Sequence, residues 1–292
     1  MTSLTHELLH DRLSDVLRLL PLAANHADDD PEYVHRLRIA TRESLAALDA
    51  FCEHLPAKET AWLRKQLKRI RSAAGQARDL DVMLRRYADS DIAGRKKILR
   101  RLRCKRDRAQ QPLVKILRRV NRQGRFRQST DACLVAIGSV PSDRVTLMLA
   151  NRIYNAAQSM LECSPNANAD GVSLHRFRVK AKQLRYALEL TRGSEADERL
   201  CELYTTAKEI QKKLGLMSDH IVAAARLESM NKRAKSKRFA GQLKREWKCE
   251  KLKAKQARKD FIRWWKSSQV VVAESLTNSR LFYAAIQEPF AS

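Results

Sequence analysis

The segment LHRFRVKAKQLRYALEL, residues 174–190, combines five lysines and arginines and one histidine with apolar residues at helical spacing. Leu174, Phe177, Leu184 and Leu188 recur at intervals of three, four and seven, which is the pattern of one buried helix face. The basic residues fall mainly on another face. The segment therefore predicts a helix that packs into a core on one side and presents positive charge on the other.

A related segment lies 140 residues earlier, in VHRLRIATRESLAALDAF, residues 34–51. With that shift His35 falls on His175 and Arg38 on Arg178, and five positions in the window 34–48 are identical. Composition alone would give about one identity in such a window. The agreement indicates that a helical unit has been duplicated.

The correspondence runs without a gap from residue 12 to residue 86. We interpret the chain as two repeats, about 1–140 and 141–292, with a linker near residues 139–142, which together form a single domain covering 1–292. The predicted fold class is all-α: a duplicated helical bundle with two pseudo-symmetric halves and long helices. A short apolar run, 132–140, is ambiguous between helix and strand. The helices are expected near 3–24, 31–54, 57–74, 79–89, 92–120, 143–162, 172–191, 196–214, 218–230, 236–266 and 276–286.

The composition favours a polyanionic partner. The chain of 292 residues carries 58 Lys and Arg against 33 Asp and Glu, a formal net charge of +25, which suits nucleic acid, an anionic membrane or another phosphate polymer. No apolar run reaches the ~18 residues of a membrane span. The six cysteines are scattered without a C-x-x-C pair, which favours reduced thiols in a cytosol.

Two short basic ladders carry the candidate site. On a helix with 100° per residue, His35, Arg38 and Arg42 lie within about 60° of one another. We call these residues the first ladder. The second ladder is longer and comprises His175, Arg178, Lys182 and Arg185. Guanidinium and ammonium groups suit phosphate oxygens, and a ladder suits a phosphate polymer better than one small anion.

These stretches resemble the CHAD domain, the conserved-histidine α-helical domain. The resemblance rests on VHRLRIATRESLAALDAF, GQARDLDV, LHRFRVKAKQLRYALEL and IQKKLGLMSDHIV and covers essentially the whole chain. It implies an all-α fold with two pseudo-symmetric halves and a basic central surface. It also implies that this surface binds inorganic polyphosphate through the two ladders.

The chain departs from the family pattern in the first half. Glu43 and Leu45 stand where the family tends to be basic, so the second ladder is expected to contribute more to binding. Lys68, Lys208 and Lys212, on the following helices, are weaker candidates for the same surface.

Two glycines have a simpler interpretation. Gly75 and Gly215 are each followed four residues later by an aspartate, Asp79 and Asp219. This spacing indicates the end of one helix and the N-cap of the next. The alternative is that the aspartates orient a ladder arginine.

Two further stretches are strongly basic. Residues 95–127 hold fifteen Lys and Arg with one acid, and residues 232–266 hold fifteen with three acids. A solvated helix face is the usual meaning of such a run, and a binding surface is the alternative; the two are compatible because long stems pack while charged heads face an anion.

Other classes of function have weaker support. Glu7 with His10 and Glu32 with His35 form the E-x-x-H pairs of di-iron bundles, but only His35 recurs in the second repeat. No nucleotide, zincin or nucleophile-elbow motif is present, so we expect a binding protein rather than an enzyme, with no catalytic residues, metal or cofactor. The alternative function is nonspecific nucleic-acid binding, although aromatic residues make up only 6% of the chain and form no evident stacking platform.

The expected location is the cytoplasm, at polyphosphate granules that the protein targets or organises. Weak binding to nucleic acid is a secondary expectation from charge alone. Protein partners, chain-length preference and oligomeric state do not follow from the sequence.

Overall fold

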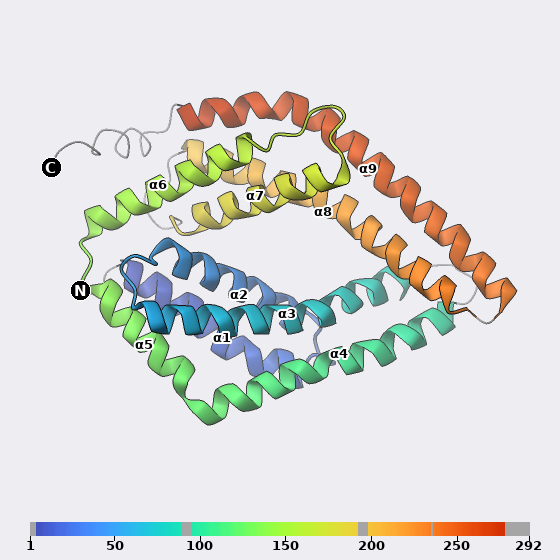
Figure 1. Cartoon of the computed structure of the whole chain (residues 1–292), viewed down its shortest axis with the longest axis horizontal. Helices are drawn as coiled ribbons and strands as arrows, with labels where there is room; N and C mark the ends of the chain where they lie inside the picture. Colours follow the sequence, from blue (N-terminus) through green and yellow to red (C-terminus); the bar gives the residue numbers. More distant parts are fainter. Residues whose placement is uncertain (1–3, 89–94, 192–197, 235, 278–292) are drawn as a thin grey trace. The chain divides into compact units, whose positions relative to one another are not determined.

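The structure is a computed structural model that describes residues 4–88, 95–191, 198–234 and 236–277 (Figure 1). Within these ranges the chain is all-α and contains no strand, which confirms the predicted fold class. The helices are α1 (Leu4–Asn25), α2 (Glu32–Ala50), α3 (Ala57–Ala88), α4 (Arg95–Gln123), α5 (Arg125–Gly138), α6 (Ser142–Leu161), α7 (Gly171–Glu189), α8 (Glu198–Lys232) and α9 (Lys237–Thr277).

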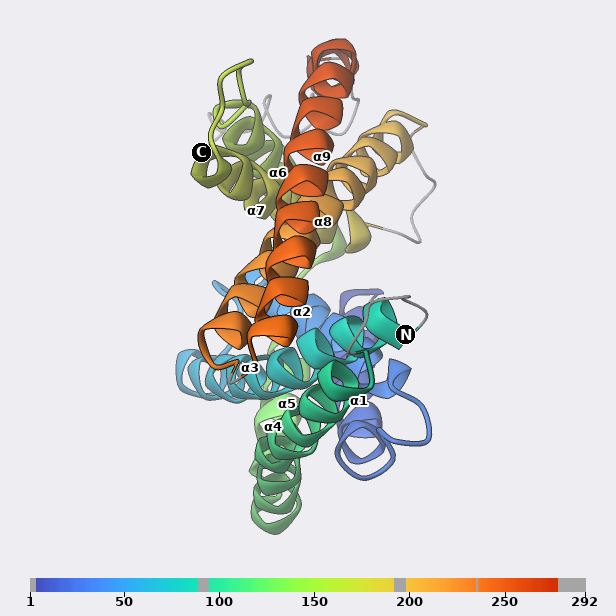
Figure 2. The same cartoon turned by 90° about the vertical axis from the view of Figure 1, so that its right-hand side faces the viewer.

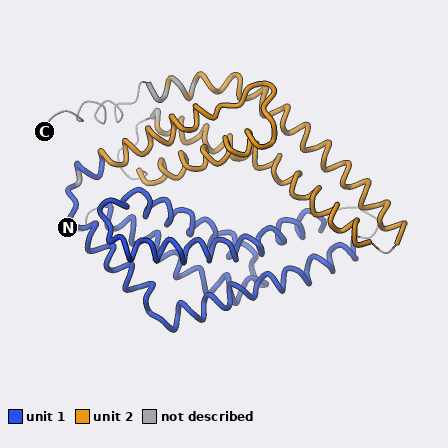
Figure 3. The backbone as a smooth tube through the Cα atoms, viewed as in Figure 1, with its two compact units in different colours: residues 1–146 blue, residues 147–292 orange. Residues whose placement is uncertain are grey.

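The chain divides into two compact units, residues 1–146 and 147–292 (Figure 3). The boundary lies in the first part of α6, a few residues beyond the predicted linker. The origin of the two units by duplication remains a prediction. Each unit is described below by itself.

In unit 1, α1 and α3 lie between α2 and α4. Helix α2 packs against α1 and α3, while α4 packs against the same two helices. Figures 1 and 2 both show α2 on one side of this pair and α4 on the other. The outer faces of α2 and α4 are therefore on opposite sides of the unit.

The sequence explains why α2 is a helix, through its stripe of apolar residues and through a hydrogen bond just before its first residue. Val34, Leu37 and Leu48 are fully buried, as the spacing predicts. Just before the helix, Asp30 Oδ1 accepts a hydrogen bond from the backbone N–H of Glu32 at 2.8 Å. Leu45 is also buried, which agrees with its exclusion from the site.

Helices α3 and α8 are continuous, which corrects the predicted breaks between 57–74 and 79–89 and between 196–214 and 218–230. Gly75 and Gly215 are interior helix residues, not helix ends. A glycine inside a helix costs only about 1 kcal/mol relative to alanine. In α3 the burial of Ile70, Ala74 and Ala77 on either side offsets this cost.

Unit 2 has an aromatic core. Phe177 of α7 contacts Trp265 and Phe261 of α9, with ring centroids 4.8 and 6.1 Å apart. Ile153 of α6 and Ile210 of α8 belong to the same buried cluster. This core fixes α7 and so positions the second ladder.

Two remaining sequence expectations concern helices. The ambiguous run 132–140 lies mostly in α5, so it is helical. The predicted helix 276–286 begins in the last residues of α9, and the rest of it falls outside the described residues.

In the described parts of the chain, no single helix is both long and apolar enough to span a membrane. Helices α5 and α6 meet these criteria only when joined as a bent pair. Helix α5 buries Phe126, Cys133 and Ile137 in unit 1.

Candidate functional site

The first ladder lies along the seam between α2 and α3. The two helices run antiparallel, because Arg78 of α3 pairs with Glu32 at the start of α2 and Arg64 pairs with Asp49 at its end. Between these pairs, His35, Arg38 and Arg42 face the part of α3 around Gly75. We call this surface the unit 1 seam; it comprises His35, Arg38 and Arg42 of α2 with Lys68, Arg71 and Arg78 of α3.

Gly75 lets Arg38 lie directly on α3. A Cβ atom added at residue 75 would overlap with Arg38 Nη1. Only a residue without a side chain admits the guanidinium this close to the helix. Gly75 therefore makes room for the Arg38 side chain and does not end the helix.

Positive charge is concentrated in the unit 1 seam. Burial, followed by the charge of Arg42, lowers the pKa of Arg38, and Arg78 and Arg71 act in the same direction. Asp79 acts in the opposite direction, which supports the alternative interpretation of this aspartate as a partner of a ladder arginine. Because an arginine stays protonated in proteins, these guanidinium groups repel one another until an anion is present.

Alanine at residue 75 is expected to raise stability and weaken anion binding at the same time. Gly75→Ala removes the helical cost of glycine, about 0.5–1 kcal/mol, but displaces Arg38 from its place on α3. Partial loss of the Arg38 contact, by about 1 kcal/mol, corresponds to about fivefold weaker polyphosphate binding. Thermal unfolding and fluorescence anisotropy with labelled polyphosphate measure the two effects.

The matched control is Gly215→Ala. A Cβ atom there would lie 3.8 Å from Arg178 Nη2, an ordinary van der Waals distance. This variant should gain stability and keep its affinity. Equal losses of affinity in both variants would contradict a positioning role specific to Gly75.

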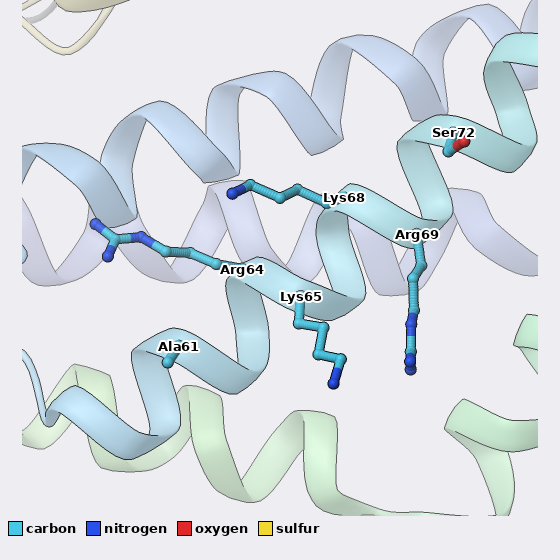
Figure 4. A pocket seen from close by; sticks show the side chains of 6 residues that line it. All are labelled: Ala61, Arg64, Lys65, Lys68, Arg69 and Ser72. Atoms are coloured by element: carbon cyan, nitrogen blue, oxygen red, sulfur yellow. The ribbon is translucent and has the colours of Figure 1, made fainter.

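The seam continues along α3 to Lys68. A pocket of about 550 Å³ along α3 is lined by Ala61, Arg64, Lys65, Lys68, Arg69 and Ser72. Figure 4 shows Arg64 and Lys68 extending to one side of the helix, and Lys65 and Arg69 to the other. Arg64 also donates a hydrogen bond to the carbonyl oxygen of Leu48 in α2 at 3.2 Å, so Lys68 lies on the side of α3 that faces α2.

In unit 2 the second ladder lies along α7, and Arg178 approaches Gly215 of α8. His175 is exposed, and Arg178 and Lys182 are half-buried. We call the surface formed by the second ladder, His175, Arg178, Lys182 and Arg185, the unit 2 seam. Asp170 begins the helix by accepting a hydrogen bond from the backbone N–H of Ser173 at 2.8 Å.

Two other candidate residues of unit 2, Arg185 and Lys212, have acidic partners within the chain. Arg185 lies 3.7 Å from the Glu189 carboxylate and over the ring of Tyr186. Lys212 lies 3.5 Å from the Glu209 carboxylate. Lys208 is exposed on α8. Arg185 and Lys212 are thus partly neutralised before any ligand arrives.

Sequence reasoning missed Arg71 and Arg78. Both lie on α3, four residues before and three residues after Gly75, and therefore share its helix face. An interior glycine flanked at this spacing by arginines was the available signal. The corresponding residues in unit 2 are Gln211 and Ser218, which hydrogen-bond to the carbonyl oxygens of Ala181 and Leu214.

The histidine of the unit 1 seam predicts a pH dependence. Burial, then the charge of Arg78, lowers the pKa of His35 below its usual 6.5. A bound phosphate raises that pKa, so binding takes up a proton, and affinity should increase as the pH falls below about 6.5. His35→Gln should flatten this dependence relative to His175→Gln, as measured by anisotropy titrations across pH. An equal slope in the two variants would assign the effect to another group.

The site offers no metal cluster in the portion of the chain that the structure describes: no three His, Cys, Asp or Glu side chains come together there. Glu32, part of one E-x-x-H pair, instead contacts Arg85 at 2.9 Å and Arg78 at 3.1 Å. These arginines lower the pKa of Glu32, with Arg85 the largest cause. The carboxylate acts as an anchor for α3 arginines.

The fold and these seams define a class of all-helical proteins in which a histidine and basic residues line a helix pair. The chain belongs to the CHAD domain family, whose model matches residues 7–228.

The chain is also similar to two other proteins and to solved structures. Two Mycobacterium tuberculosis proteins, MT2285 and Rv2226, are each 28% identical over 214 residues, which covers 68% of this chain and 40% of theirs. This chain thus spans less than half the length of those relatives. The CHAD domain from the plant Ricinus communis has a TM-score of 0.66 at 18% identity, covering 95% of this chain and 92% of its own. PptA from Streptomyces chartreusis has a TM-score of 0.60 at 19% identity, covering 91% and 100%. These two likenesses concern the fold.

Proposed function

We propose that this protein binds inorganic polyphosphate through the basic seams of its two units. The observation that carries the proposal is the cluster of Arg38, Arg42 and Arg78 beside His35, where burial first and then these positive charges lower the pKa of His35 and of Arg38. An anion with several phosphates offsets this repulsion at several points, whereas a single small anion offsets it at one. The CHAD family is associated with polyphosphate binding, which supports the same ligand.

The shape of the seam favours a linear phosphate chain. Basic groups follow α2 for about two turns, each turn rising about 5 Å, and Lys68 extends the row on α3. A chain of linked phosphates can contact these groups in succession. A nucleic acid offers one phosphate per nucleotide and requires room for bases, and the seam has no aromatic platform to stack them.

The proposed role is to bind and organise polyphosphate, as a binding module without chemistry of its own, at polyphosphate granules in the cytoplasm. Competition tests the ligand. Unlabelled linear polyphosphate should displace labelled polyphosphate at lower phosphate concentration than DNA or RNA does. Equal or better displacement by nucleic acid would overturn the proposal in favour of nonspecific nucleic-acid binding.

Affinity should fall steeply with salt. A basic seam that contacts about five phosphates releases their counterions, so affinity should drop about a hundredfold between about 50 and 200 mM salt. Anisotropy titrations across this range give the slope of log affinity against log salt. A flat line would remove the electrostatic mechanism, even if polyphosphate were bound.

A further inference from the structure

Helix α4 presents a second basic surface in unit 1. It buries Ile98, Leu102 and Leu113 against α3 and α1, and its opposite face is exposed and basic. Residues on this face include Lys96, Arg100, Arg103, Arg108, Arg118 and Arg122, all exposed. Asp107 is the only acid among residues 95–127. We call these six residues the α4 face.

The α4 face is separate from the unit 1 seam. Its apolar side contacts α1 and α3, so its basic side points away from both helices. Helix α2 lies on the far side of α1 and α3 in Figures 1 and 2. A phosphate chain held against α2 therefore leaves the α4 face open to another chain.

The α4 face differs from the seam in chemistry. In the unit 1 seam His35, Arg38, Arg42 and Arg78 are half-buried. The side chains of the α4 face are all exposed and spread along the outer side of one helix that is about 40 Å long. Such exposed charges give weak contacts that sum over a long polyanion. The apolar side of α4 is already buried in the unit, so this amphipathic helix has no free apolar face to insert into a membrane.

We propose that the α4 face binds a second polyphosphate chain, so that one molecule bridges two chains. This inference rests on the proposed function. It assigns polyphosphate as the ligand of the α4 face, a surface outside the unit 1 seam. Bridging joins long chains into a network. It supplies a physical means by which the protein organises a granule.

The test is capture of a second chain. Polyphosphate is fixed to beads, the full-length protein is bound and excess is washed away, and fluorescent polyphosphate is then added. The variant Arg100→Gln/Arg103→Gln/Arg118→Gln/Arg122→Gln removes four charges from the α4 face. Lys58→Gln/Arg144→Gln/Arg233→Gln/Lys266→Gln removes the same charge from scattered exposed positions and is the matched control.

Wild type and control should capture the second chain, and the α4 variant should bind the beads normally yet capture about tenfold less, as expected for four exposed contacts. Normal capture by the α4 variant, or equal loss in the control, would overturn the inference. Better capture of duplex RNA than of polyphosphate would also overturn it. Failure of wild type to bind the beads would instead refute the proposed function.

Discussion

Replacing Arg38 and Arg42 with glutamine should weaken polyphosphate binding by about a hundredfold. Both side chains are half-buried, and charge-assisted contacts of this kind are worth about 1.5–3 kcal/mol each. Two of them give about 3 kcal/mol, with incomplete additivity because they are neighbours. Anisotropy titrations with labelled polyphosphate measure the loss, and circular dichroism confirms that helix content is unchanged.

The matched variant in unit 2, Arg178→Gln/Lys182→Gln, should lose only about tenfold, since the surrounding charge is lower. Ladder length alone predicts the reverse, because the second ladder has a third basic residue, Arg185. The structure changes that expectation: Arg185 contacts Glu189, while α3 adds Arg71 and Arg78 to the unit 1 seam. A larger loss in the unit 2 variant would show that the α3 arginines do not set the affinity.

The second large effect is on stability and involves the buried ion pair between Arg106 and Asp81. Arg106 of α4 is buried and its Nε donates a hydrogen bond to Asp81 of α3, with side-chain exposures of 5% and 6%. Arg106 Nη1 also donates to Gln110 Oε1 at 2.8 Å, and Gln110 Nε2 donates to the Ala24 carbonyl oxygen at the end of α1. This network joins α4 to α3 and α1.

Arg106→Met should therefore lower the free energy of unfolding by about 3–5 kcal/mol, because it leaves Asp81 buried without its charged partner. For a unit of this size the unfolding midpoint should fall by about 10 °C. Asp81→Leu should lower the free energy of unfolding by a similar amount, because it leaves the Arg106 charge buried without its partner. Thermal unfolding followed by circular dichroism measures both.

The control is the double variant Asp81→Leu/Arg106→Met, which removes both charges together. Burial raises the pKa of Asp81, and Arg106 acts in the opposite direction, so the cost of burying the two charges opposes their mutual attraction. The double variant should thus be nearly as stable as the wild type. A loss of unfolding free energy in the double variant equal to the sum of the two single losses would contradict this account. A loss of polyphosphate affinity at the seam in the folded double variant would also contradict it.

Much of the fold followed from periodicity. The apolar stripes of α2 and α7 placed Leu37 and Phe177 in the core and the ladders on another face, because one helix surface is determined by local spacing. The breaks at Gly75 and Gly215 were wrong, because a glycine's local cost does not reveal whether neighbouring burial outweighs it.

The site was less accessible from sequence. His35, Arg38 and Arg42 share a face of one helix, so the spacing was sufficient to group them. Arg71 and Arg78 join them only because α3 packs antiparallel to α2 in a particular register, and no local pattern determines that register. One continuous site formed by both seams likewise remains a prediction.

The most direct test of the central claim is a crystal structure of the full chain bound to linear polyphosphate. The account predicts phosphates within hydrogen-bonding distance of Arg38 and Arg42, with the chain continuing along α3 toward Lys68. A polyphosphate chain bound only at sites away from the unit 1 seam, with Arg38 and Arg42 still without a phosphate contact, would contradict it.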